Sequence, residues 1–271
     1  SRSKYNAVDG CIFTNNTAYA KTTSSDATRG GGAIYWSEDG KYGTVKNSKF
    51  YYNSVQSAND KKVDGGAILW DKSYHALVDH CDFVGNFVTT NGDGGGASGS
   101  AVWAQGGAMY LRPKENYTIS NCLFENCSSS KEAGALYIQS QESAGSVTIK
   151  DTVFKNNFAN ATGTENLNGG GAVQVKQAQK VTFQNVQFIN NSANKGGAVS
   201  VYNCKNDNTK LFDNCTFENN TAEGTNTEIG YGGAIFYSEA NKNNLNIINS
   251  NFTYNKAERG SAIYSTVSYN R

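Results

Sequence analysis

Residues 31–53 read GGAIYWSEDGKYGTVKNSKFYYN, and this stretch contains both motifs that recur along the 271-residue chain. The first motif is Gly-Gly-Ala followed by an aliphatic residue, and the second is Phe-x-x-Asn. The phenylalanine of the second motif stands at Phe13, Phe50, Phe83, Phe124, Phe154, Phe188, Phe217 and Phe252, with Cys127 replacing Asn in the fourth copy. The first motif occupies 31–34, 65–68, 106–109, 170–173, 196–199 and 232–235, with weaker copies at 133–136 and 260–263. The phenylalanines recur every 34 residues or so, which defines one structural repeat.

Alignment of the repeats on the phenylalanine reveals further columns of similar residues. An apolar residue stands five positions earlier, and small residues stand two positions earlier and five positions later. Columns of like residues indicate stacking, because each short strand can pair with its equivalent about 4.8 Å away in the next repeat. The sequence therefore predicts an all-β fold, a right-handed parallel β-helix of about eight coils with three short strands per coil. We expect it to form a single domain over residues 1–271.

The position three before each phenylalanine is mostly Asn, as at Asn47 and Asn185. We expect this column to form a corner of each coil, since Asn tolerates left-handed backbone and its amide can bond the residue above and below. Cysteines fill the small inner column at Cys11, Cys81, Cys122 and Cys215. Free thiols are expected, because Cys81 and Cys122 lie in adjacent coils and their in-register side chains would strain a disulfide.

Composition excludes several classes of function. The formal net charge is +1, whereas a nucleic-acid binder needs a basic face. No apolar run approaches the roughly 18 residues of a membrane helix, so no membrane insertion is expected within this segment. The chain has only two histidines, His75 and His80, and its six cysteines form no CxxC pair. No metal site and no cofactor are therefore predicted.

The alternation of Phe-x-x-Asn with Gly-Gly-Ala-Ile resembles the repeat pair of the polymorphic outer-membrane proteins of Chlamydia. The stretches at 31–53 and 196–222, the latter reading GGAVSVYNCKNDNTKLFDNCTFENNTA, also resemble the adhesin-like surface proteins of methanogenic archaea. These resemblances cover residues 8–264. They imply a pectin-lyase-like β-helix in a large extracellular protein at the cell surface, acting in attachment to host cells or microbial neighbours.

The first coil begins in the middle of a repeat, and no amphipathic cap is visible at either end. We therefore expect the chain to be a segment excised from a longer surface protein, with its signal and anchor outside the segment.

The binding site is predicted on the Gly-Gly-Ala strands. The residue after Ala is always aliphatic and should point inward, so the next residue should point outward. This outward column is rich in aromatic residues, which can stack on sugars or bind a protein partner. The candidate ligand-binding residues are Tyr35, Leu69, Tyr110, Tyr137, Phe236 and Tyr264, together with Trp103 in the long insertion over residues 89–105. The alternative is that these rings stack only to stabilise the rod or are covered by the insertions.

The favoured function is a non-catalytic adhesin segment that binds a protein or glycan on a partner cell. A second hypothesis is a structural spacer or filament segment that projects another domain. A third is a polysaccharide lyase or hydrolase, for which acidic residues would have to converge. The acidic residues nearest one another, and a histidine beside them, are Asp60, Asp64, Asp71, Asp79, Asp82 and His80, but they do not repeat in neighbouring coils.

Overall fold

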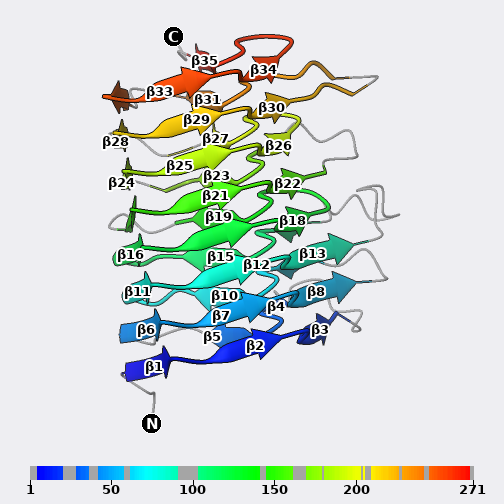
Figure 1. Cartoon of the computed structure of the whole chain (residues 1–271), viewed down its shortest axis with the longest axis vertical. Coiled ribbons are helices and arrows are strands. Elements are labelled where there is room, and N and C mark those ends of the chain that lie inside the picture. Colours follow the sequence, from blue (N-terminus) through cyan, green and yellow to red (C-terminus); the bar gives the residue numbers. More distant parts are fainter. Residues whose placement is uncertain are drawn as a thin grey trace.

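The computed structural model is a rod of eight stacked coils, with the two ends of the chain at opposite ends of the rod (Figure 1). The structure describes residues 5–20, 29–36, 42–57, 62–90, 103–140, 145–160, 169–178, 180–202, 204, 209–225, 228–240 and 244–268. Every strand pair within these residues is parallel, and in all five sheets each strand pairs with its equivalents in the neighbouring coils. The predicted parallel β-helix is confirmed.

One sheet contains the aliphatic column. Its strands are β1 (Tyr5–Asp9), β6 (Tyr42–Lys46), β11 (His75–Asp79), β16 (Asn116–Ser120), β20 (Ser146–Lys150), β24 (Lys180–Gln184), β28 (Thr209–Asp213) and β32 (Asn244–Ile248). Val45 pairs with Val8 on one side and Val78 on the other, as the sequence alignment predicts.

A second sheet, here called the Phe sheet, contains the phenylalanine column. Its strands are β2 (Ile12–Thr14), β7 (Lys49–Tyr51), β12 (Asp82–Val84), β17 (Leu123–Glu125), β21 (Val153–Lys155), β25 (Gln187–Ile189), β29 (Thr216–Glu218) and β33 (Asn251–Thr253). The eight rings form one continuous internal stack, with successive centroids 4.6–5.3 Å apart. Phe50 and Phe83 lie in adjacent coils, so the predicted register is confirmed.

A third sheet contains the Gly-Gly-Ala strands. Its strands are β5 (Ile34–Trp36), β10 (Ile68–Asp71), β15 (Met109–Arg112), β19 (Leu136–Gln139), β23 (Val173–Lys176), β27 (Val199–Tyr202), β31 (Ile235–Ala240) and β35 (Ile263–Ser268). The aliphatic residue after Ala, such as Ile68, packs into the main core with the phenylalanines. Trp36 and Trp70 also lie on this inner side, with ring centroids 4.3 Å apart.

The Gly-Gly pair has two separate steric roles, illustrated by Gly65 and Gly66. Gly65 has a φ of +63°, which a residue with a side chain rarely adopts. A Cβ on Gly66 would lie 2.0 Å from the carbonyl oxygen of Gly107 in the next coil. The first glycine therefore makes the turn, and the second lets successive coils approach to hydrogen-bonding distance.

Each coil also has a short fourth strand, which runs through the small column five residues after Phe. These strands are β3 (Thr17–Tyr19), β8 (Ser54–Ser57), β13 (Phe87–Thr90), β18 (Ser128–Ser129), β22 (Phe158–Ala159), β26 (Ser192–Ala193), β30 (Thr221–Ala222) and β34 (Lys256–Ala257). A three-stranded sheet lies just before the first three Gly-Gly turns, with strands β4 (Arg29–Gly30), β9 (Val63–Asp64) and β14 (Ala104–Gln105).

The asparagine of Phe-x-x-Asn forms a buried ladder along the rod. The Asn157 amide nitrogen donates to the Oδ1 of Asn191 at 2.9 Å and to the carbonyl oxygen of Phe124 at 3.0 Å. The backbone N–H of Asn157 also donates to Asn191 Oδ1. Each amide thus satisfies groups of both neighbouring coils, which is why the position is Asn in seven of eight coils. Cys127 replaces it in coil 4, where its backbone N–H donates to Asn157 Oδ1 and its thiol lies 3.4 Å from the Phe83 carbonyl oxygen, but it offers Asn86 no amide oxygen.

The second asparagine column, three residues before Phe, lies at an exposed corner. Asn47 and Asn185 have φ values of +49° and +54°, so the predicted left-handed corner is confirmed. Asn185 Nδ2 donates to Asp151 Oδ1, and Asn214 Nδ2 donates to Asn185 Oδ1. This ladder is exposed to water, unlike the Phe-x-x-Asn ladder.

The cysteines of the small inner column are free thiols, as expected. Cys81 and Cys122 are buried, and Cys11 in the first coil is exposed. Within the described residues, no helix is long and apolar enough to cross a membrane.

Candidate functional site

The predicted aromatic column points away from the main core but is mostly inaccessible. Leu69, Tyr110 and Tyr137 are each 0% exposed and form a separate small cluster with Ala133. The expectation of a solvent-facing stripe is therefore wrong for these three residues. The alternation of side chains along each strand correctly places this column on the outer side of the Gly-Gly-Ala sheet. It does not show that other residues cover that side.

The column is covered by the residues that precede each Gly-Gly turn. A Cβ at Gly30 would lie 2.8 Å from Leu69 Cδ2, so the chain before the turn lies directly against this column. At the other end of the rod, the Tyr231 ring lies 4.6 Å from that of Tyr264 and 6.3 Å from that of Phe236. In these coils the residue before the Gly-Gly turn thus packs onto the outer face of the Gly-Gly-Ala sheet.

The other members of the predicted stripe differ in accessibility. Tyr35 is 50% exposed, Phe236 is 9% exposed, and Tyr264 is half-buried. Trp103 is half-buried, and Lys176 Nζ lies 4.7 Å from the centroid of its ring. The remainder of the predicted long insertion, residues 91–102, lies outside the described residues.

Beneath this cover lies a network of buried polar groups. Gln105 Nε2 donates to Glu132 Oε2, and Gln174 Nε2 donates to Glu132 Oε1 at 3.3 Å. Burial raises the pKa of Asp64 to about 7 and also raises the pKa of Glu132. Lys62 Nζ lies 3.5 Å from Asp64 Oδ2 and partly offsets the effect of burial. Both carboxyl groups are fully buried, so this arrangement presents no acid to a large substrate.

Two of the other acidic candidates for catalysis, Asp71 and Asp79, have structural partners. Arg112 Nη1 lies 3.0 Å from Asp71 Oδ1 in the adjacent coil. Burial alone would raise the pKa of Asp79, but hydrogen bonds from Ser120, Asn121 and His80 outweigh burial and lower it to about 2. Asp60 lies outside the described residues, and no group of three or more His, Cys, Asp or Glu in the described part of the chain could hold a metal ion.

The most distinctive exposed aromatic residue is Tyr52, on the corner after the Phe sheet. Its φ is +55°, a left-handed conformation that is uncommon for a bulky side chain, yet it is 57% exposed. The next coil has Gly85 at the equivalent position, where a Cβ would lie 2.5 Å from the Cδ1 and Cε1 atoms of Tyr52. The tyrosine ring therefore rests on Gly85.

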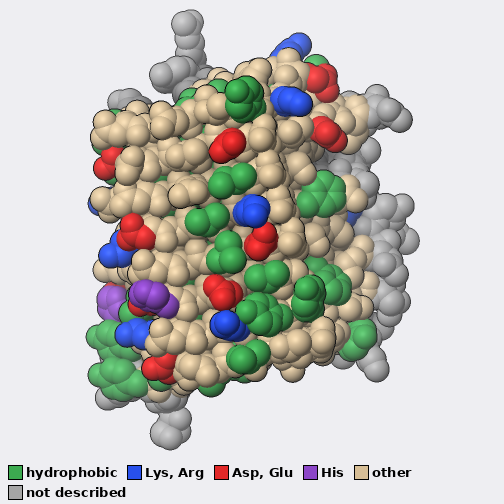
Figure 2. All heavy atoms as spheres, viewed as in Figure 1, with side chains coloured by type: hydrophobic (Ala, Val, Ile, Leu, Met, Phe, Trp, Pro, Cys, Tyr) green, Lys and Arg blue, Asp and Glu red, His purple; other side chains and the backbone are tan. Residues whose placement is uncertain are grey.

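Apolar side chains surround Tyr52 on the same face of the rod. Figure 2 shows hydrophobic side chains gathered on this face. Tyr51 pairs with Val84 across the Phe sheet, and Phe87 is half-buried on the fourth sheet. Phe158, two coils beyond Phe87 on the fourth sheet, is 44% exposed. We call Tyr51, Tyr52, Val84 and Phe87 the Tyr52 face; it offers one prominent ring on a flat, partly apolar surface.

Sequence reasoning missed Tyr52, although a signal was present. The position two after Phe holds Asn15, Tyr52, Gly85, Asn126, Asn156, Asn190, Asn219 and Tyr254. All eight residues have positive φ, so Asn and Gly are the expected occupants and the two tyrosines stand out. The equivalent of Tyr52 in the next coil is Gly85, so a comparison of adjacent repeats shows a bulky ring beside a position that has no side chain.

Comparison with protein-family models gives two matches. The model of the right-handed β-helix region matches residues 1–170. The model of the Chlamydia polymorphic membrane protein repeat matches residues 185–202 and 214–238. Comparison with curated proteins and with solved structures gives no match. The predicted handedness and the resemblance to the polymorphic membrane protein repeat are confirmed, and the resemblance to archaeal adhesin-like proteins stays a prediction.

Proposed function

The chain belongs to the right-handed β-helix family, and on this premise we propose that it is an attachment segment of a cell-surface protein. The polymorphic membrane protein repeat is found in surface-exposed proteins, which indicates a location at the cell surface. Attachment to another cell is a more specific proposal than this location. In this proposal the rod presents a recognition surface to a protein or glycan on another cell and catalyses no reaction.

The Tyr52 face is the observation that supports attachment. A ring held in a fixed position loses little conformational entropy when it binds, so it contributes more of its contact energy to affinity. In this proposal the packing of the Tyr52 ring over Gly85 limits its freedom before any partner binds. Aromatic anchors of this type dominate the binding energy of many interfaces.

Tyr52→Ala tests the proposal. We expect attachment of the purified chain to target cells to fall about tenfold or more, as for loss of an aromatic hot spot. The melting temperature should stay within a few degrees, since the ring is more than half exposed. Tyr254→Ala is the matched control, because Tyr254 occupies the same left-handed position in coil 8 and is 74% exposed.

A second variant tests the role of the fixed ring. Gly85→Asn keeps a residue that tolerates positive φ, as Asn126 does at this position in the next coil. The Asn side chain would displace the Tyr52 ring, so attachment should fall while the coil remains folded. Normal attachment by both Tyr52→Ala and Gly85→Asn would contradict the proposal.

The two alternatives predict different results. If the rod is only a spacer or filament segment, purified chain should not bind cells at all, with or without Tyr52. If it is a polysaccharide lyase or hydrolase, it should release products from polygalacturonate in the presence of calcium. Either outcome would replace the attachment proposal.

A further inference from the structure

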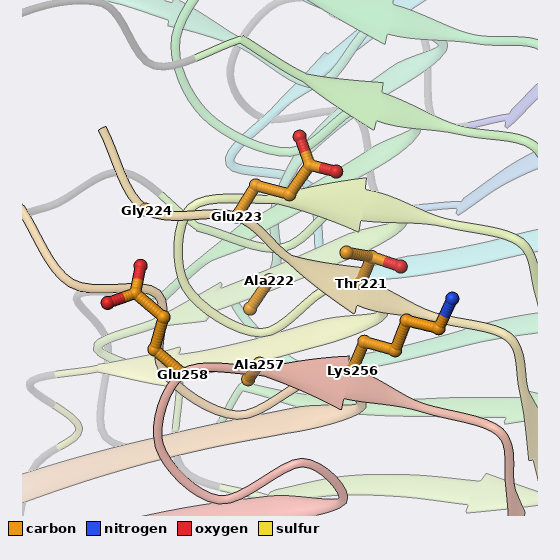
Figure 3. A pocket seen from close by; sticks show the side chains of 7 residues that line it. All are labelled: Thr221, Ala222, Glu223, Gly224, Lys256, Ala257 and Glu258. Atoms are coloured by element: carbon orange, nitrogen blue, oxygen red, sulfur yellow. The ribbon is translucent and has the colours of Figure 1, made fainter. Parts of the chain in front are cut away.

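A second candidate binding region lies on the fourth sheet, in coils 5–8, away from the Tyr52 face. It consists of two adjoining hollows that share Glu223 and Gly224. The larger, about 400 Å³, is lined by Thr221, Ala222, Glu223, Gly224, Lys256, Ala257 and Glu258 (Figure 3). The smaller, about 130 Å³, is lined by Phe158, Ala159, Asn160, Ser192, Ala193, Asn194, Glu223, Gly224 and Thr225.

The hollows exist because the fourth-sheet strands are short here and bear small residues. Strands β22, β26, β30 and β34 have two residues each, whereas β8 and β13 have four. Gly224 has a specific role, since a Cβ there would lie 2.1 Å from Glu258 Oε1. Absence of a side chain at this position leaves room for the Glu258 carboxylate, which also accepts the backbone N–H of Gly230 at 3.3 Å.

The larger hollow contains two carboxylates, those of Glu223 and Glu258. Glu223 and Glu258 follow β30 and β34, which pair in register, so their side chains extend from adjacent coils. Neither carboxylate has an ion-pair partner among the described residues, whereas Lys195 is paired with Glu228 at 3.6 Å. Figure 3 shows the side chain of Lys256 extending away from that of Glu258. Like charges at facing positions of paired strands are destabilising, and a bound cation would offset this repulsion.

An independent observation comes from Asn194, which lines the smaller hollow and is only 5% exposed. Its amide nitrogen donates to the carbonyl oxygen of Glu223 at 2.9 Å, which fixes the orientation of the amide. Its Oδ1 is buried and has no donor within the described part of the chain. A buried acceptor without a donor is costly, and a donor that fills the hollow would satisfy it.

We propose that these hollows bind the guanidinium group of an arginine side chain on a partner protein. A guanidinium has five N–H donors, no acceptor and a permanent positive charge, which complements two carboxylates and an amide oxygen. Its planar face can also stack on an aromatic ring, and Phe158 at the rim is 44% exposed. A neutral glycan fits less well, because its hydroxyl groups also need donors from the protein.

NMR titration of the full chain with a blocked Gly-Arg-Gly tripeptide tests the proposal. We expect saturable shifts of the Asn194 side-chain amide and the Phe158 ring, with a Kd on the order of 1 mM for so small a ligand. The same peptide with citrulline, which has nearly the same shape but no charge, should give no shifts. The Glu223→Gln/Glu258→Gln double variant should bind the arginine peptide at least tenfold more weakly.

Glu218→Gln is the matched control, because Glu218 lies on the adjacent Phe sheet outside both hollows and should leave binding unchanged. Equal shifts with the citrulline peptide, equal shifts with a neutral oligosaccharide, or no shifts near Asn194 would each overturn the proposal. The comparison of the two peptides uses the unmodified chain, so it decides the question even if the double variant misfolds. Tyr52→Ala should still bind the arginine peptide, which separates this site from attachment through the Tyr52 face.

Discussion

The two asparagine columns of the rod differ in burial and in what their amides bind. Asn191 is fully buried, donates to Phe154 and Asn220, and accepts from Asn157. Asn185 lies on the exposed corner, and its side-chain amide bonds the side chains of Asp151 and Asn214, which water also reaches. An asparagine of the buried column should therefore contribute more to the free energy of unfolding than an asparagine of the exposed column.

Asn191→Leu should lower the free energy of unfolding by about 3 kcal/mol or more, since several buried donors and acceptors lose their partners. Asn185→Leu should cost roughly 1–2 kcal/mol, mostly because Leu is strained in the left-handed conformation. Urea unfolding of the two variants measures the difference. Equal midpoints would show that the buried ladder contributes no more than the exposed one.

Cys127 interrupts the buried ladder, so a substitution there should stabilise the protein. Cys127→Asn would give Asn86 an acceptor in the next coil and would replace the weak thiol donation to the Phe83 carbonyl with an amide donation, as in the other coils. The expected gain is about 1–2 kcal/mol in the free energy of unfolding. Cys127→Ser, which is too short to reach both groups, is the control and should not stabilise. A destabilised Cys127→Asn protein would mean that coil 4 differs in shape from its neighbours.

At the scale of the element, the outer face of the Gly-Gly-Ala sheet is a second, smaller core. Tyr110 donates to Gln139 Oε1 at 2.6 Å, and its ring stacks on Tyr137 at 5.2 Å. Tyr137→Ala should destabilise the rod by about 3–5 kcal/mol, as for other buried aromatic residues. Tyr35→Ala, which removes an exposed ring of the same column, should cost less than about 1 kcal/mol. Thermal unfolding of the two variants distinguishes a core from a binding surface.

Strand β9 should make the stability of the rod depend on pH through Asp64. The pKa of Asp64 is about 7 in the folded state, whereas the ordinary value of 3.8 applies to the unfolded chain. The unfolded chain therefore releases this proton at lower pH. Asp64 thus contributes most to the free energy of unfolding below about pH 4. This contribution falls by a few kcal/mol as the pH rises toward 7. Groups near Asp64 that modify this titration are Lys62, Asp71, Tyr110, Arg112 and Tyr137.

Asp64→Asn isolates this effect from the other carboxyl groups. Between pH 4 and pH 7 the unmodified chain should lose stability through Asp64, and the variant should not. The variant should therefore become more stable relative to the unmodified chain as the pH rises. Chemical unfolding at several pH values measures it. A difference that does not change over this range would mean that Asp64 is ionised in the folded state throughout.

The sequence predicts the coils better than it predicts the surface. The phenylalanine, aliphatic and asparagine columns each recur eight times or nearly so, so the register of stacked strands follows from similarity alone. Burial of Tyr110 depends on Asp64 and its equivalents, which differ from coil to coil and pack across the turn. The position of Tyr52 likewise depends on Gly85 in the next coil. Such contacts between unlike residues of adjacent coils have no period, so alternation along one strand cannot reveal them.

At the scale of the whole molecule, stability should be distributed coil by coil. In a solenoid each repeat contacts only its neighbours, so a local defect weakens nearby coils most. Phe124 is fully buried between Phe83 and Phe154, whereas Phe252 in coil 8 is partly buried and, among the described residues, stacks only on Phe217.

Phe124→Ala should therefore destabilise the rod by about 3–5 kcal/mol, and Phe252→Ala by less. Amide hydrogen exchange measures where the loss falls. In Phe124→Ala, strands β12, β17 and β21 should exchange faster, while β2 and β33 at the two ends should change little. In Phe252→Ala, faster exchange should be confined to β29 and β33. Uniform acceleration along the whole chain in both variants would instead show that all eight coils unfold as one cooperative unit, because a nearest-neighbour solenoid opens locally before it unfolds globally.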